Sequence, residues 1–218
     1  MKKLFILFVL AVTAVAACCA PAAGEAAEDT EFRWSDPGNH LTDVLAPRKE
    51  IHDEKEAEAY AEELWALLSS DPLPDGVREM NVDRQDGSYH FSISDENEAA
   101  IYCANFLSNG LIQQIGYYEN DSEWASEGLR RDGKTLKAEA WESAESQIIE
   151  QVERLVPGAL ALVKPLNVFQ IIDFGDRQYL IIYAEPLDPA IETGVNITAV
   201  LEADGTCRLL DYSCYGAG

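Results

Sequence analysis

Five cysteines offer most of the covalent chemistry in this sequence: Cys18, Cys19, Cys103, Cys207 and Cys214. In a protein outside the cytoplasm, the four that follow Cys18 could form two disulfides. Cys207 and Cys214, however, lie on one predicted strand, where about 3.3 Å per residue puts them roughly 23 Å apart and on opposite faces. A disulfide needs Cα atoms within about 7 Å, so this pair cannot form while the strand is straight. Other pairings stay open, and small buried thiols are the alternative.

Acid–base and metal chemistry have no readable motif here. The sequence contains no His-Glu-x-x-His, Gly-x-Ser-x-Gly or Cys-x-x-Cys pattern, and no glycine-rich phosphate loop. The three histidines, His40, His52 and His90, fall in separate predicted segments, and the calcium-loop pattern of spaced aspartates is missing. Carboxylates are so numerous that no catalytic pair stands out. We therefore predict no catalytic, cofactor-binding or metal-binding residue, which favours a binding or regulatory module over an enzyme.

The chain is strongly acidic, with a net charge of −23 from 16 basic and 39 acidic side chains. Such a surface repels phosphate backbones, so we expect no nucleic-acid partner. We interpret the charge as a solvated coat that keeps an exported protein soluble. A field that steers a cationic partner or calcium is the alternative. Apolar residues make up 47% of the chain, which is enough to form a core.

Residues 1–17 have the form of a secretory signal. Lys2 and Lys3 precede an apolar run from Leu4 to Ala17. This run is too short to span a bilayer comfortably, since a spanning helix needs about 20 residues. We therefore expect the mature chain to lie outside the cytoplasm.

The run ends in Val15-Ala16-Ala17-Cys18. This ending resembles the bacterial lipoprotein signal, in which a branched aliphatic residue, two small residues and a cysteine form the processing site. The resemblance implies cleavage before Cys18, diacylation of its thiol and acylation of the new amino terminus. Together these acyl chains would anchor the protein stably in the membrane. An ordinary signal peptide cut after an Ala-x-Ala site is the alternative.

Composition divides the rest of the chain. Residues 19–31 are alanine, proline, glycine and acid, which is typical of a tether. Apolar residues among turn formers follow up to residue 50, and we expect them to pack as an irregular arm on the first unit. The expected parts are a signal peptide (1–17), a lipid anchor, tether and arm (18–50), a first unit (51–120), a linker (121–135) and a second unit (136–218).

Two amphipathic helices are predicted. The first begins after Asp53, which is followed three residues later by Glu56 in a variant of the capping box. The second runs from about Leu136 to Val156. Each carries apolar residues at helical spacing on one stripe and acidic residues elsewhere.

Strands follow each helix. Residues 77–83 and 88–94 are strand candidates, and the second alternates apolar and polar residues. Two hairpins, in residues 102–118 and 198–215, contain Asn-Gly and Asp-Gly between apolar runs and predict two-residue type I′ turns. We therefore predict a duplicated α+β fold of two tandem units, each one helix packed on a three- to four-stranded antiparallel sheet.

The helix starts EAEAYAEEL and KAEAWESAE, with the two hairpins, cover roughly residues 53–118 and 136–215. This layout resembles the PepSY-like modules of exported bacterial proteins and, more loosely, cystatin-type folds. The resemblance implies a non-catalytic module that binds peptides or inhibits exported peptidases at the envelope. It carries over no ligand residue, because the match is one of layout.

These observations predict a lipid-anchored extracytoplasmic binding protein of the cell envelope. Its partners would be the membrane, through lipid on Cys18, and an envelope or secreted protein. We expect the working surface on the exposed side of a sheet or in the groove between the units. One alternative is a structural or assembly lipoprotein. Another is an envelope hydrolase, which would need a deep cleft holding two acids with raised pKa values.

Overall fold

The structure, a computed structural model, describes residues 40–83, 87–97, 99–118 and 128–214. The chain divides into two compact units, Met1–Trp34 and Ser35–Gly218. The predicted signal peptide, Cys18, Cys19 and the predicted tether (19–31) lie outside the described residues. No helix in the described ranges is both long enough and apolar enough to cross a membrane.

The described residues form three α-helices, two short 3-10 helices and nine strands. The helices are α2 (Leu41–Val44), α3 (Glu54–Leu68), η1 (Gly133–Thr135), α5 (Ala138–Leu155) and η2 (Leu160–Leu162). The strands are β1 (Val77–Asp83), β2 (Ser88–Ser94), β3 (Ala100–Leu107), β4 (Ile112–Tyr117), β5 (Leu129–Asp132), β6 (Asn167–Asp173), β7 (Arg177–Ala184), β8 (Val195–Glu202) and β9 (Cys207–Ser213).

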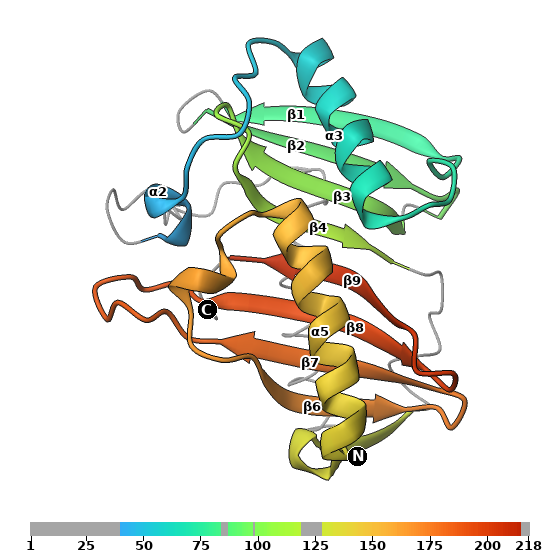
Figure 1. Cartoon of the computed structure of the whole chain (residues 1–218). Coiled ribbons are helices and arrows are strands. Elements are labelled where there is room, and N and C mark those ends of the chain that lie inside the picture. Colours follow the sequence, from blue (N-terminus) through green and yellow to red (C-terminus); the bar gives the residue numbers. More distant parts are fainter. Residues whose placement is uncertain (1–39, 84–86, 98, 119–127, 215–218) are drawn as a thin grey trace, which may run out of the picture. The chain divides into compact units, whose positions relative to one another are not determined.

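The prediction of two tandem helix-on-sheet units is wrong. All nine described strands form one antiparallel sheet in the order β1-β2-β3-β4-β9-β8-β7-β6-β5 (Figure 1). The reason is that β4 and β9, the last strands of their respective meanders, pair with each other instead of remaining as exposed edges. An unpaired edge strand exposes backbone hydrogen-bonding groups, which this pairing satisfies.

Helix α3 forms where the capping signal predicted it. The Asp53 side chain accepts a hydrogen bond from the Glu56 amide at 2.8 Å, which satisfies one of the free donors of the first turn. Its apolar stripe faces the sheet. The Tyr60 hydroxyl donates to the carbonyl of Gly110 at 2.7 Å, and the Tyr102 hydroxyl of β3 donates back to the helix.

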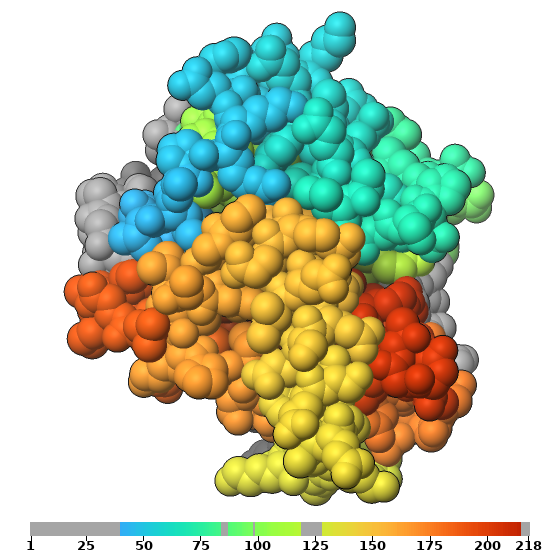
Figure 2. Space-filling view, in the orientation of Figure 1, coloured from blue at the N-terminus to red at the C-terminus, as the bar shows by residue number. Residues whose placement is uncertain are grey.

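Both long helices cover the same face of the sheet. Figure 1 shows α3 in front of β1 to β3 and α5 in front of β6 to β9. In the space-filling view of this face, the α5 residues border the cyan and teal half that contains α3 (Figure 2), and the two helices are in contact. The opposite face of the sheet carries neither of these helices.

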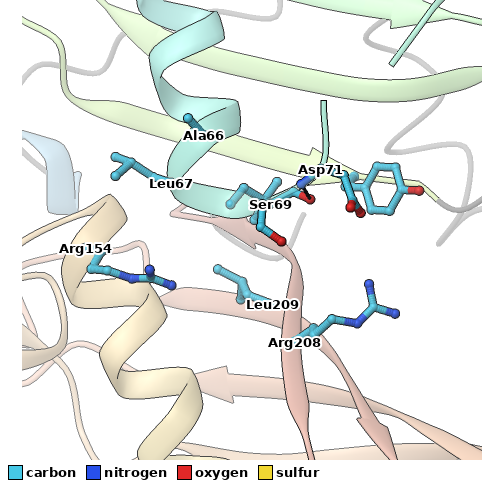
Figure 3. Close-up of a pocket in the computed structure, with 10 residues that line it drawn as sticks. Ala66, Leu67, Ser69, Asp71, Arg154, Arg208 and Leu209 are labelled. Carbon is cyan, nitrogen blue, oxygen red and sulfur yellow. Dashed lines mark hydrogen bonds between the residues drawn. The ribbon is translucent and has the colours of Figure 1, made fainter. Parts of the chain in front are cut away.

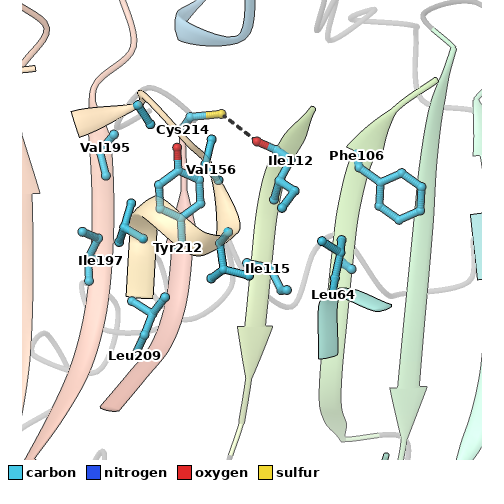
Figure 4. Close-up of a cluster of buried hydrophobic side chains, with 14 of the residues drawn as sticks. Leu64, Phe106, Ile112, Ile115, Val156, Val195, Ile197, Leu209, Tyr212 and Cys214 are labelled. Carbon is cyan, nitrogen blue, oxygen red and sulfur yellow. Dashed lines mark hydrogen bonds between the residues drawn. The ribbon is translucent and has the colours of Figure 1, made fainter. Parts of the chain in front are cut away.

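A single apolar cluster lies between the helices and the sheet and crosses from one half to the other. Figure 4 shows Leu64 and Phe106 from the first half in the same cluster as Ile197 and Leu209 from the second. A continuous core of this kind has no boundary at which two independent units would separate. The Tyr212 hydroxyl lies inside this core and makes no hydrogen bond with any described residue.

The arm before α3 contacts both halves. Backbone amides of Arg48 and Ile51 donate to the β3–β4 loop. The Arg48 guanidinium donates to the carbonyl of Leu155 at the end of α5. The amide of Leu41 donates to the Thr193 hydroxyl, 152 residues away. The arm thus contacts both halves of the described unit and not the first half alone.

Both predicted hairpins form, but their turns differ from the prediction. Gly110 donates to the carbonyl three residues earlier, and Gly205 does the same, with φ angles of 75° and 87°. The flanking residues then pair across three-residue loops. This is a type I turn followed by a left-handed glycine, which needs positive φ at one residue, whereas the expected type I′ turn needs it at two.

Cys103, Cys207 and Cys214 are buried, and no disulfide joins any two of them. Cys207 and Cys214 belong to the same core cluster, although seven residues separate them. A straight strand would put them on opposite faces, but the register of β9 against β8 shifts between Leu209 and Asp211, where Leu210 is the extra residue. Such a bulge reverses the alternation of side chains beyond it.

Candidate functional site

The two halves of the sheet join along a short ladder, which we call the seam. It consists of the residue pairs Gln114–Ser213, Ile115–Tyr212 and Gly116–Asp211. The other ladders of the sheet each pair at least four residues. The seam is therefore where two strands far apart in sequence meet with the fewest paired residues.

Outside the seam, the start of β9 forms hydrogen bonds with side chains of helix α5. The Gln147 side chain accepts from the Cys207 amide at 2.9 Å and donates to the Gly205 carbonyl at 3.0 Å. The Gln151 side chain accepts from the Leu209 amide and donates to the Cys207 carbonyl, both at 2.9 Å. The two amides, one helical turn apart, take the place of a neighbouring strand. This part of β9 is consequently closed to pairing with an added strand.

On the helix-bearing face, β4 and β9 diverge beside a groove of about 300 Å³, which we call the seam groove (Figure 3). It is bounded by the end of α3, the last residue of β4, the last turn of α5 and the start of β9. The lining residues are Ala66, Leu67, Leu68, Ser69, Ser70, Asp71, Tyr117, Arg154, Arg208 and Leu209. Its volume lies at the lower end of the roughly 300–1,000 Å³ typical of ligand sites.

Two guanidinium groups stand in this groove of a very acidic chain. Figure 3 shows Arg154 and Arg208 on either side of Leu209, with Ser69 and Asp71 on the α3 side. Arg208 pairs with Glu202 at 3.2 Å. The Arg154 side chain makes no hydrogen bond or ion pair with any described residue. The groove thus combines an apolar wall with charge of both signs.

The opposite face of the seam carries a chain of polar side chains, which we call the polar network. On β2 and β3, His90 Nδ1 lies 2.9 Å from Asn105 Oδ1, and the Asn105 amide donates to Gln114 at 3.1 Å. The Gln114 amide in turn lies 3.4 Å from the Tyr118 hydroxyl and 3.5 Å from Asp211 Oδ1. Tyr118 donates to Asp211 at 3.2 Å. The network thereby connects four strands across the seam.

Asp211 is the titratable end of the network. Burial raises its pKa from an ordinary 3.8 to about 6, although hydrogen bonds from Gln114 and Tyr118 oppose this rise. Burial and the neighbouring Asp211 charge hold the pKa of Tyr118 far above its usual 10.0, so the phenol stays protonated and donates. Gly116 leaves room for the Asp211 carboxylate and the Tyr118 hydroxyl. A Cβ at this position would lie 2.6 Å from Asp211 Oδ1 and 2.8 Å from the Tyr118 hydroxyl oxygen.

The residues singled out from the sequence are spread over the molecule. Cys103 lies 3.5 Å from the Tyr118 hydroxyl at the edge of the polar network, while the other two described cysteines are in the core. His90 joins the network and is half-buried, whereas His40 and His52 are remote from it. Within the described ranges, no group of three His, Cys, Asp or Glu side chains could hold a metal ion.

Sequence reasoning missed the network residues Asn105, Gln114, Tyr118 and Asp211. A signal was present for Asn105, which is the one polar residue in the otherwise apolar strand β3. The sequence did not show that β3 and β9 lie on neighbouring halves of one sheet.

Comparison with known proteins identifies no relative of this chain. It matches no family model, no curated protein and no solved structure. The resemblances to lipoprotein signals and to PepSY-like modules therefore stay predictions.

Proposed function

We propose that this chain is a non-catalytic binding protein, anchored at the extracytoplasmic side of the cell membrane through lipid on Cys18. It recognises an envelope or secreted protein through the seam groove. The observation that carries the binding half of the proposal is the groove itself, in which two arginines flank an apolar wall. The anchoring half rests on the basic, apolar and cysteine-terminated leader.

The chemistry of the groove supports recognition more than catalysis. Its polar groups belong to two arginines, two serines, Asp71 and Tyr117, and no histidine or cysteine lines it. On the other face, Asp211 hydrogen-bonds with an amide and a phenol, and no second described carboxyl group takes part in that network. A carboxylate hydrolase would need a second acid beside the first.

A capture experiment tests the binding half. Residues 20–218, immobilised, are exposed to detergent-solubilised envelope proteins and to secreted proteins, first in low and then in moderate salt. We expect a specific partner that survives moderate salt, because a contact that includes apolar burial is not screened away. A partner found at constant stoichiometry in every preparation would favour the assembly lipoprotein instead. Loss of all partners as salt rises would contradict the proposal.

A pair of variants tests the anchoring half. Cys18→Ala removes the acceptor of the lipid, and Cys19→Ala is the matched control one residue away. We expect the Cys18→Ala protein to leave the membrane fraction, while the Cys19→Ala protein stays in it and partitions into detergent. Membrane association that is equal in the two variants would refute lipidation at Cys18.

A further inference from the structure

We infer that the seam groove binds the free carboxyl terminus of a polypeptide whose last side chain is apolar. This inference rests on the proposed function and specifies the chemical class of its partner. Four features of the groove lead to it: an arginine that pairs with no described residue, a second arginine across an apolar wall, an aspartate on the α3 side, and a volume that suits one terminal residue.

Arg154 is placed to bind an anion. It lies in the last turn of α5 and is exposed. Positive charge in this position usually complements the helix end, but here Arg48 already donates to the carbonyls of Arg154 and Leu155. The Arg154 guanidinium has no hydrogen bond or ion pair with a described residue, so its five N–H donors are available to a ligand.

Arg208 supplies a second positive charge on the other side of Leu209 (Figure 3). Its ion pair with Glu202 holds the side chain at the start of β9. The forked guanidinium group matches a carboxylate geometrically and stays charged at every physiological pH. The chain as a whole is acidic and repels anions at long range. An anionic ligand must therefore gain its affinity from contacts inside the groove.

Asp71 distinguishes a peptide end from an inorganic anion. Its carboxylate, on the α3 side of the groove, would repel phosphate or sulfate. A terminal residue, in contrast, presents an amide N–H to Asp71 and a carboxylate to Arg154. The last side chain then covers Leu67 and Leu209, which provide apolar surface between the polar groups.

The groove volume agrees with an occupant of this size. About 300 Å³ is the lower end of the range for ligand sites, which suits an occupant as small as one terminal residue. The Gln147 and Gln151 side chains occupy the neighbouring backbone of β9. The peptide therefore enters end-on and does not add as a strand.

The test is fluorescence anisotropy with the full-length protein in detergent micelles at moderate salt. The probe is a rhodamine-labelled Gly-Ser-Gly-Ser-Leu peptide with a free carboxyl terminus. Two further probes are the same peptide with an amidated end and an amidated peptide ending in glutamate, which offers a side-chain carboxylate. We expect saturable binding of the first probe and at least about tenfold weaker binding of the other two, because each loses the terminal carboxylate.

Three variants assign the effect to the groove. Arg154→Gln should weaken the first probe at least about tenfold, and Arg208→Gln roughly threefold, since Arg208 is already paired. Arg78→Gln is the control, because Arg78 pairs with Glu62 on the surface of the first half, outside the groove. It should change the affinity less than about twofold.

Several results would overturn the inference. One is the absence of saturable binding of the first probe at millimolar concentration. A second is that the amidated probe binds as tightly as the first probe. A third is that the glutamate probe binds as tightly as the first probe, which would mean that the groove recognises acidic side chains. An equal loss in Arg78→Gln and Arg154→Gln would also do so. If a captured envelope partner binds the Arg154→Gln protein undiminished, this inference fails while the proposed function stands. If no partner is captured, the proposed function itself fails.

Discussion

Protonation of Asp211 should control the stability of the seam. In the unfolded chain this carboxyl ionises near its ordinary 3.8, whereas in the folded protein its pKa is about 6. Between these values the folded state binds more protons than the unfolded state. The free energy of unfolding therefore falls as pH rises from about 4 to 6 and is level above that range.

The magnitude follows from the difference between the two pKa values. At 1.36 kcal/mol per pH unit, a rise from 3.8 to about 6 corresponds to about 3 kcal/mol. This value is a ceiling, because Asp211 is only partly buried and water screens some of the effect. We expect about 2 kcal/mol between pH 4 and pH 7.

Urea unfolding of the native protein and of Asp211→Asn, followed by circular dichroism at pH 4, 5, 6 and 7, measures this term. Asparagine keeps an oxygen that accepts from Tyr118 but does not titrate. The stability of the native protein minus that of the variant should fall by about 2 kcal/mol over this range. Taking this difference cancels the repulsion among the other carboxylates, which also grows with pH.

Asp204→Asn is a control of opposite sign. Hydrogen bonds from Thr206 lower the pKa of Asp204, so its contribution is present above the ordinary value and is lost as pH falls through the lowered one. The corresponding difference should not decrease between pH 4 and pH 7. If the Asp211 difference is equally flat, to within about 0.5 kcal/mol, the carboxyl group is well solvated and our account of the polar network is wrong.

Five other substitutions test particular contacts. Tyr212→Phe should leave the free energy of unfolding unchanged or raise it by up to about 1 kcal/mol, because the hydroxyl has no partner among the described residues. Tyr102→Phe should lower it by about 1 kcal/mol, because the Tyr102 hydroxyl donates to α3. The opposite order of the two variants in urea unfolding would contradict this. Gly116→Ala should destabilise the protein by about 1–3 kcal/mol in the same assay and flatten the pH effect, because its Cβ would displace the network carboxylate and phenol; a neutral result would mean the network can shift freely. Gln147→Ala and Gln151→Ala should speed hydrogen exchange at the β9 amides that they hold, and unchanged protection would show that these bonds are dispensable.

Local features of the fold could be predicted from the sequence. Strands at residues 77–83 and 88–94 were expected with the bounds that the structure has, and α3 begins at the predicted cap. Each of these depends on neighbours within a few residues: alternation along a strand, or a side chain that caps its own helix.

Pairing between distant segments could not be predicted in the same way. Nothing in the β4 sequence indicates that its free edge meets β9, about 100 residues later, because the pairing depends on no local turn or cap. The bulge at Leu210 is also invisible locally, and it reverses which face each later residue occupies. The predicted fold class was therefore wrong because it missed the β4–β9 ladder, which joins strands about 100 residues apart.

The candidate site also depends on the pairing of β4 with β9. The pair Gly116–Asp211 is the last one of the seam, and it produces a different feature on each face of the sheet. On one face, the glycine leaves room for the carboxylate and the Tyr118 hydroxyl, which extend hydrogen bonding across the seam. On the other face, the strands diverge past this pair, so β9 turns to the glutamines of α5 and the groove opens beside Tyr117 and Arg208. The polar network and the seam groove both begin at this one pair. A change that displaces Asp211 should therefore alter the groove as well as the network, even though the two lie on opposite faces of the sheet.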